Sequence, residues 1–369
     1  MVPSKRQSRT SRMERSPALY LGVFGKHPGW DDHIDDIGLD TERLAAARRI
    51  LYADGIAGNI DSGAWEKLDD TQRLPGFAHE IVWRHPDGFV VGRMWSSRDG
   101  KGRTKYPMSA VVQTHDVPAE FVERRVVPTL EEVERRCAVT NSAAEVRQVV
   151  EDARKQLRAE LMLGVSPDAT VAGEEITTAD DLARLAGHRD LAGDGMLRIL
   201  YELERELVSF RAHRQGDTRW MTRSAEPRGQ SLRLPACAPT ALESARLWRG
   251  LLDTQIDPST SVLAIKPAGR EWIDVIVGDA APAHLFCVRA TDKGLALASQ
   301  VPYTLDDEFV NRAKASIEAW RRGELPRVDD GASSRRSGIR PMPPLDQAEP
   351  KPSSAGPSKR PGWLKWLLP

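Results

Sequence analysis

Glycine and lysine residues at positions 22–27 have the composition of a phosphate-binding loop but not its spacing. The segment reads Gly22-Val23-Phe24-Gly25-Lys26-His27-Pro28. A phosphate loop needs four residues between its glycines, so that successive backbone N–H groups surround the phosphate, and a Ser or Thr after the lysine for magnesium. Here two residues separate the glycines, and Pro28, which has no N–H, follows His27. The spacing therefore disfavours nucleotide binding at Lys26.

The next ten residues are rich in side chains that can bind a metal ion. They are His27, Asp31, Asp32, His33, Asp35 and Asp36. No histidine pair has the i, i+4 spacing of a helical metal site, and the rest of a ligand set cannot be specified. A polar loop before a helix explains the aspartates, as does a charged surface for a protein partner. We therefore predict no metal and no cofactor.

A second group of charges surrounds a glycine turn. Arg98, Lys101, Arg103 and Lys105 flank Gly100 and Gly102. One interpretation is a solvated hairpin tip. The other is a contact with an anion or an acidic partner, because glycine-turn N–H groups and nearby cations suit carboxylate or phosphate.

No residue is predicted to be catalytic. The segment Asp61-Ser62-Gly63 lacks the glycine spacing of a nucleophile elbow. The three cysteines, Cys137, Cys237 and Cys287, are too scattered for a disulfide framework or a zinc site, and we interpret them as buried thiols.

The elements that position these residues follow from hydrophobic periodicity and turn signals. In the first part, these signals predict a strand at 18–24 and a helix at 41–55. Three strands follow, at 77–84, 89–95 and 106–114, and then a helix after Pro118 that is interrupted at Pro128. The middle predicts helices along 146–161, from Thr178 onward and along 196–207. The last part predicts the first order again, at 232–234, 241–254, 262–266, 272–277, 284–289 and 306–321.

This repeated order predicts an α/β (α+β) fold of two similar units. Each unit is a mainly antiparallel sheet flanked by helices, and a helical middle region joins them. The predicted parts are a disordered leader at 1–17, an N-terminal domain at 18–137, a helical connection at 138–229, a second unit at 230–325 and a proline-rich tail at 326–369.

The tail ends in an apolar tip that includes Trp363 and Trp366. One interpretation is a tip without a partner or one that docks on its own chain. The other is a short motif that anchors in the groove of a partner protein.

Composition narrows the class of function. Hydrophobic content of 40% and charged content of 29% are typical of a globular protein, and 53 basic and 53 acidic residues balance. This balance gives no general attraction to nucleic acid, and no apolar run approaches the ~20 residues of a membrane span. We therefore expect a cytoplasmic protein whose partners are proteins.

Two motifs in the first part resemble the TagF family of type VI secretion accessory proteins. The segment from Phe24 to Pro28, followed by Asp31-Asp32, is similar to the family's Phe-Gly-Lys-Leu-Pro and Gly-Asp-Phe. Downstream, Ser97-Arg98-Asp99, Gly102-Arg103 and Tyr106-Pro107-Met108 resemble a second family segment. The resemblance covers about residues 18–137. His27 replaces a leucine, and residues 29–33 depart from the family pattern.

The resemblance implies a non-enzymatic regulator. It implies an α/β domain without catalysis that represses type VI secretion after translation by binding a forkhead-associated scaffold protein. The predicted partner-binding residues are Lys26, Trp30, Asp31, Asp32, Arg98, Asp99, Arg103, Trp363 and Trp366. An adaptor in another signalling system, linked to a small GTPase or a kinase, is the alternative, followed by an enzyme acting on phosphate or a nucleotide near Lys26 and Arg98.

Overall fold

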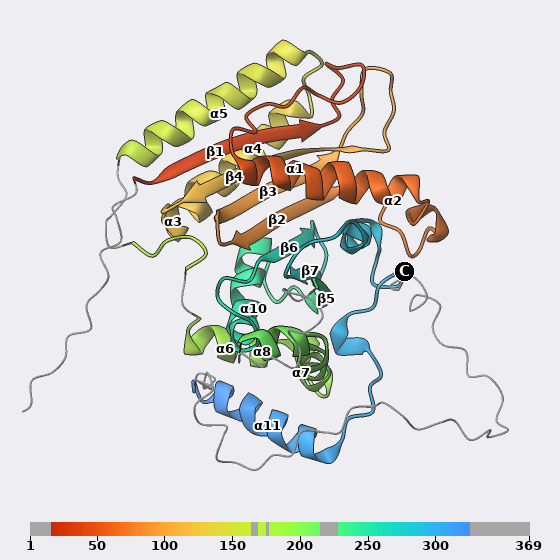
Figure 1. Ribbon diagram of the computed structural model, residues 1–369, viewed down its shortest axis with the longest axis vertical. Helices are drawn as coiled ribbons and strands as arrows, with labels where there is room; N and C mark the ends of the chain where they lie inside the picture. The colour runs from red at the N-terminus through yellow and green to blue at the C-terminus, as the bar shows by residue number, and fades with distance from the viewer. Residues whose placement is uncertain (1–15, 164–168, 175–176, 215–227, 325–369) are drawn as a thin grey trace, which may run out of the picture. The chain divides into compact units, whose positions relative to one another are not determined.

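A single antiparallel sheet organises the chain. A computed structural model describes residues 16–163, 169–174, 177–214 and 228–324. Within these ranges seven strands pair in the order β1-β4-β3-β2-β6-β7-β5, and every neighbouring pair is antiparallel (Figure 1). The strands are β1 Ala18–Gly25, β2 Ala78–His85, β3 Gly88–Ser96, β4 Pro107–His115, β5 Gln230–Pro235, β6 Val262–Pro267 and β7 Trp272–Val277. The predicted α/β class with an antiparallel sheet is confirmed.

The two predicted units share this one sheet. Strand β2 pairs with β6 from Arg84↔Val262 to His79↔Pro267, so the two parts of the chain meet in the middle of the sheet (Figure 1). Outward from this junction the order is β2-β3-β4-β1 on one side and β6-β7-β5 on the other. The prediction of two similar units is therefore not confirmed, because one side has a strand that the other lacks.

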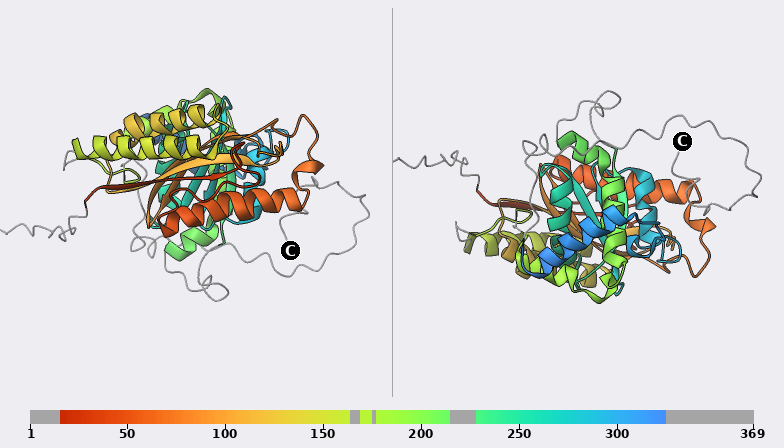
Figure 2. Two further views of the ribbon diagram at one scale, coloured as in Figure 1. Left: turned by 90° about the horizontal axis from the view of Figure 1, so that it is seen from above. Right: turned by 90° about the horizontal axis from the view of Figure 1, so that it is seen from below.

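Helices cover both faces of the sheet. The first face packs against α4 (Val127–Cys137), α5 (Ala143–Leu163) and α10 (Ala241–Gln255). Behind α10, the helices α6 (Ala179–Ala186) and α7 (Gly195–Glu206) extend the same apolar cluster, and α11 (Asp307–Arg321) packs on α6 and α7. The second face packs against α1 (Glu42–Arg48), η1 (Arg49–Ile56), η2 (Trp65–Lys67) and η5 (Pro282–Arg289). Figure 2 shows α1 and α5 on opposite sides of the strands. The remaining helical segments are α2 (Ala57–Asp61), α3 (Ala119–Phe121), η3 (Val122–Val126), η4 (Arg189–Leu191), α8 (Val208–Arg214) and η6 (Ala298–Gln300).

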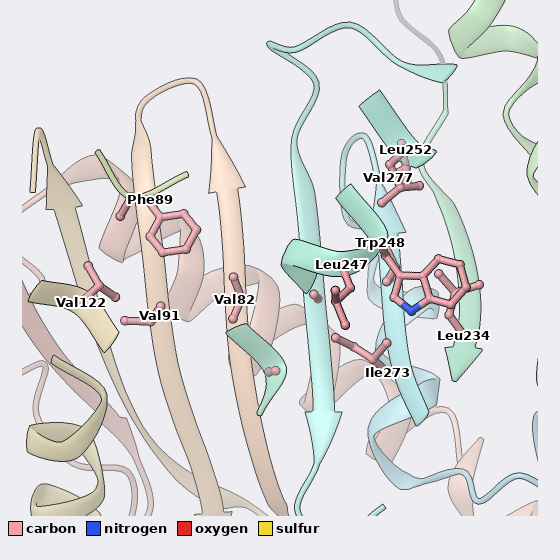
Figure 3. Packing of buried hydrophobic residues seen from close by; sticks show 14 of the residues in the cluster. Val82, Phe89, Val91, Val122, Leu234, Leu247, Trp248, Leu252, Ile273 and Val277 are labelled. Atoms are coloured by element: carbon pink, nitrogen blue, oxygen red, sulfur yellow. The ribbon is translucent and has the colours of Figure 1, made fainter. Parts of the chain in front are cut away.

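Alternation along the strands explains the two apolar layers. In β3, Val91 and Trp95 belong to the first layer, whereas Val90 and Met94 belong to the second. Successive strand residues point to opposite faces, so a run of apolar residues supplies both layers. Figure 3 shows the first layer, where Phe89 and Val91 lie beside Val82, which neighbours Leu247 of α10.

The predicted helix starts are confirmed by their caps. The Thr41 hydroxyl accepts a hydrogen bond from the N–H of Leu44 before α1. Thr178 and Asp181 form a reciprocal capping box at α6, and Asp306 caps α11. Each cap satisfies an N–H that has no partner inside the helix. None of the described helices is both long and apolar enough to cross a membrane.

The strand predicted at 284–289 is wrong. Residues Pro282–Arg289 form the 3-10 helix η5. The Arg233 side chain, on β5, donates to the carbonyls of Cys287, Ala290 and Thr291, and to Asp274 on β7. These bonds fix a compact path for the segment, and no local sequence pattern reports them. The predicted interruption at Pro128 is also not seen, because α3, η3 and α4 follow without a break and Pro128 sits in the first turn of α4.

Glu202 on α7 is a carboxyl group in an unfavourable environment. Burial, followed by the charge of Glu206, raises the pKa of Glu202 to about 7, and the Tyr303 hydroxyl donates to it. An unfolded glutamate titrates near ~4.3, so the ionised group opposes folding progressively as the pH rises from ~4 to ~7. We expect Glu202→Gln to raise the free energy of unfolding by about 1–3 kcal/mol at pH 8 and by less than about 0.5 kcal/mol at pH 4. Urea denaturation at both pH values measures this, and an equal gain at both would contradict it.

Candidate functional site

The two sequence motifs meet at a buried ion pair. Lys26 follows β1, and Asp99 lies in the loop between β3 and β4. Lys26 Nζ lies 2.7 Å from Asp99 Oδ2, and the two residues are 2% and 1% exposed. Lys26 Nζ also donates to Asp32 Oδ1 at 2.9 Å. The ammonium group of Lys26 therefore links two segments that are 73 residues apart in the chain.

Asp99 organises the hairpin loop around itself. Its Oδ1 atom accepts from the backbone N–H groups of Lys101 and Arg103, and its Oδ2 atom accepts from Arg103 Nε at 2.6 Å. Burial alone would raise the pKa of Asp99. The hydrogen bonds from Lys26 and Arg103 outweigh that effect and hold the pKa well below its usual range. Among the described residues, Asp99 forms ion pairs with Lys26 and Arg103 and not with its neighbour Arg98.

Arg103 joins the two loops on the solvent-exposed side of the ion pair. Its Nη2 atom donates to Asp31 O at 2.9 Å and to Asp32 Oδ1 at 3.1 Å. The backbone N–H of Gly100 donates to Trp30 O at 2.6 Å. The first loop, residues 26–37, and the hairpin loop, residues 97–106, therefore form one surface, which we call the loop–hairpin surface.

Gly25 permits this close approach. Its φ of +117° is a backbone conformation that other residues rarely adopt, and a Cβ there would lie 2.3 Å from Pro107 O. Sterics therefore require glycine at the exit of β1.

A π-helical segment brings a tyrosine to the ion pair. Tyr52 lies on η1, and its hydroxyl group is 2.8 Å from His33 Nδ1. The rings of Tyr52 and Tyr106 are 5.7 Å apart, and Lys26 Nζ lies 5.5 Å from the Tyr106 ring centre. Sequence reasoning missed Tyr52, because a π-helix changes which residues face inward and has no simple sequence period, whereas Tyr106 belongs to the second motif.

His27, the residue that departs from the family motif, points inward. Its ring is 1% exposed, Nδ1 accepts from the Gly29 N–H at 3.0 Å, and Nε2 lies 3.0 Å from Cys137 O. This pattern assigns the neutral tautomer with hydrogen on Nε2, which donates to the carbonyl of Cys137, the last residue of α4. Burial lowers the pKa of His27, which favours the same neutral form. The histidine that stands in place of the family's leucine therefore makes its contacts in the interior of the fold.

Trp30 anchors the other departure from the motif, at residues 29–33. Its indole N–H donates to Asp35 at 3.3 Å, and Arg147 of α5 lies over its ring. Arg147 also pairs with Asp35 at 2.7 Å. A Cβ at Gly29 would lie 2.4 Å from the backbone nitrogen of Ala143, so the loop rests directly on the start of α5.

The exposed charges of the site lie around the hairpin tip. Asp31, Arg98, Lys101 and Lys105 are exposed, and none of these four side chains forms an ion pair with another described residue. Lys26 and Asp99, by contrast, are interior residues that a partner cannot reach without opening the loops. The structure therefore divides the predicted contact residues into an internal pair and a surface. Trp363 and Trp366 lie outside the described residues.

The site offers no free nucleophile among these residues. The Lys26 ammonium group is held by two carboxylates, and the histidines of the loop are engaged by Cys137 and Tyr52. Burial raises the pKa of the Cys137 and Cys237 thiols to about 12, so both are protonated at neutral pH. In the described part of the chain, no group of three or more His, Cys, Asp or Glu side chains is arranged to hold a metal ion.

Comparison with known proteins identifies no family for this chain. No family model matches the chain, and no curated protein matches it. The likeness to the TagF family therefore rests on the motif residues themselves.

Proposed function

We propose that this protein is a non-enzymatic adaptor that regulates type VI secretion in the cytoplasm by binding a forkhead-associated scaffold protein. One observation supports the proposal most. The two segments that resemble the TagF family are joined by the Lys26–Asp99 ion pair into one surface. A motif whose parts lie in contact is expected of a functional unit, whereas independent structural motifs need not meet.

The internal pair and the exposed charges have different roles in this proposal. Lys26 and Asp99 set the relative position of the two loops. Asp31 and Arg98 then carry the charges that meet the partner, with Trp30 as a partly buried apolar centre. Interfaces commonly combine an aromatic anchor with polar residues at its rim.

An adaptor in another signalling system would use the same surface. The genes beside this one discriminate between the two functions. Genes for a secretion sheath or spike favour type VI secretion, and their absence favours the alternative.

A binding measurement with surface variants tests the proposal. We expect the forkhead-associated protein encoded beside the secretion genes to bind the purified full chain in isothermal titration calorimetry. The double variant Asp31→Lys, Arg98→Glu should weaken binding about tenfold or more, since both rim charges are reversed. The control is Arg189→Glu on η4, whose side chain is 78% exposed and which should change the dissociation constant less than about twofold.

Thermal unfolding of the same variants separates binding from folding. Both should keep the wild-type unfolding midpoint, because neither alters a buried group. Absence of binding by the wild-type chain, or an equal loss in the control, would exclude this surface as the contact.

A further inference from the structure

A hollow lined by cations lies outside the site described above. It has a volume of about 600 Å³ and is lined by residues 70, 71 and 73–75, by Arg270 in the turn between β6 and β7, and by Arg289 at the end of η5 and residues 291–293 after it. Its charged lining residues are Arg73, Arg270, Arg289, Lys293, Asp70 and Asp292. We call it the arginine hollow. Four cations face two carboxylates, so the hollow has a surplus of two positive charges.

The walls of the arginine hollow are fixed by backbone hydrogen bonds. The N–H of Leu74 donates to Arg289 O, and the N–H of Thr291 donates to Gln72 O, each at 2.7 Å. The Thr291 hydroxyl donates to Thr71 O at 2.7 Å. The 71–74 and 289–291 segments are therefore paired, and their backbones are held in place before any ligand arrives. Such preorganisation reduces the entropy that binding would cost.

Arg289 is a partly buried cation without a carboxylate partner among the described residues. Its guanidinium lies 4.9 Å from the Phe77 ring centre and 5.9 Å from that of Trp65. Its Nε atom donates to Leu74 O at 3.0 Å. Burial, followed by repulsion from Arg73, lowers the pKa of Arg289, and only the charge of Glu66 opposes this shift. Nothing within the described fold neutralises this guanidinium at contact distance.

The other charges of the hollow are weakly paired. Arg73 Nη2 lies 3.3 Å from Asp70 Oδ1, but that carboxylate side chain is 99% exposed and therefore well solvated. Arg270 lies 5.7 Å from the Trp272 ring centre and forms no ion pair with a described carboxylate. Arg73, Arg270 and Arg289 can thus all turn N–H groups toward a common anion.

We propose that the arginine hollow binds the phosphoryl group of a small molecule. A phosphate monoester carries a charge of about −1.5 to −2 at pH 7, which matches the surplus of two positive charges. Planar guanidinium groups bind its oxygens in pairs, and several arginines around one hollow favour a tetrahedral oxyanion over a single carboxylate. The volume is within the ~300–1,000 Å³ of small-molecule sites, so there is room for an organic group on the phosphate.

Calorimetry with two phosphate probes tests the proposal on the full chain. We expect inorganic phosphate and glycerol phosphate to bind with dissociation constants at or below about 1 mM at low ionic strength, whereas sodium chloride at the same ionic strength gives no saturable heat. Tighter binding of glycerol phosphate identifies an ester as the ligand. Equal affinities identify the phosphoryl group alone as the ligand.

Two variants locate the binding. Arg270→Gln changes an exposed turn residue, and Arg73→Gln removes a second cation without touching the aromatic packing under Arg289. Each should raise the phosphate dissociation constant about tenfold. Lys155→Gln on α5, whose side chain is 70% exposed, is the matched control and should leave it unchanged.

Failure of wild-type protein to bind either probe would overturn the proposal, as would equal binding by the control and the arginine variants. The variants lie outside the loop–hairpin surface. Loss of phosphate binding with normal partner binding would therefore separate this site from the proposed adaptor function.

Discussion

Replacing Arg233 with methionine is expected to lower the free energy of unfolding by about 3–5 kcal/mol, because it breaks a fully buried ion pair. The side chains of Arg233 and Asp274 are 0% exposed, with Nε 2.7 Å from Oδ1 and Nη2 2.8 Å from Oδ2. The variant leaves the Asp274 carboxylate buried without its cation. A loss of this size is a large part of the ~5–15 kcal/mol that stabilises a typical domain.

The same change releases four backbone carbonyls. Arg233 donates to the carbonyls of Cys287, Ala290, Thr291 and Leu295, which hold the chain after η5. We therefore expect local opening of residues 287–295 in hydrogen exchange, in addition to the global loss. Chemical denaturation of Arg233→Met measures the global loss.

A double variant distinguishes the ion pair from simple packing. Arg233→Met combined with Asp274→Leu removes both charges and should recover part of the stability lost in the single variant, because no charge is left buried. A single variant as stable as the wild type, or a double variant less stable than the sum of both single losses, would contradict this account.

Replacing Lys26 with methionine is expected to lower the midpoint of thermal unfolding by about 5–10 °C. Methionine fills a similar volume but leaves Asp99 with only Arg103 and two backbone N–H groups as partners. Lys155→Met, at an exposed position on α5, is the control and should shift the midpoint by less than about 1 °C.

The loss at Lys26 should depend on pH in a defined direction. The folded pKa of Asp99 lies below its unfolded value of ~3.9, so the stabilisation by Lys26 is fully present above that value and is lost as the pH falls through the folded pKa. The difference between wild type and Lys26→Met should therefore be constant above about pH 5 and narrow below about pH 4. Differential scanning calorimetry across this range measures it. A constant difference down to pH 2 would show that the Asp99 charge is not what Lys26 stabilises.

Much of the fold was predictable from local signals. Strands such as β3 and β7 are apolar runs bounded by turn residues, and the caps at Thr41, Thr178 and Asp306 define helix starts by side chains three residues from their N–H donors. The failure at residues 284–289 has a different cause. Apolar residues there fit a strand equally well, and the deciding bonds come from Arg233, which lies more than 50 residues away.

The site was predicted in residue identity but not in role. Lys26, Asp32, Asp99 and Arg103 were all selected, and the structure brings them into one network. Their burial could not be read from sequence, because Lys and Asp are usually exposed unless paired. The arginine hollow was not anticipated at all, since its cations come from three separate segments that carry no motif.

The pairing of β2 with β6 also bears on how the chain is made. Strand β2 is complete about 180 residues before β6 leaves the ribosome, which at ~5–20 residues per second is a delay of roughly 10–40 s. During that time the edge of β2 that later pairs with β6, which includes Ile81, Val82 and Trp83, has no strand to pair with. An unpaired apolar edge is a template for association with other chains. Newly synthesised protein should therefore depend on a chaperone that shields this edge, and chains that end before residue 262 should aggregate.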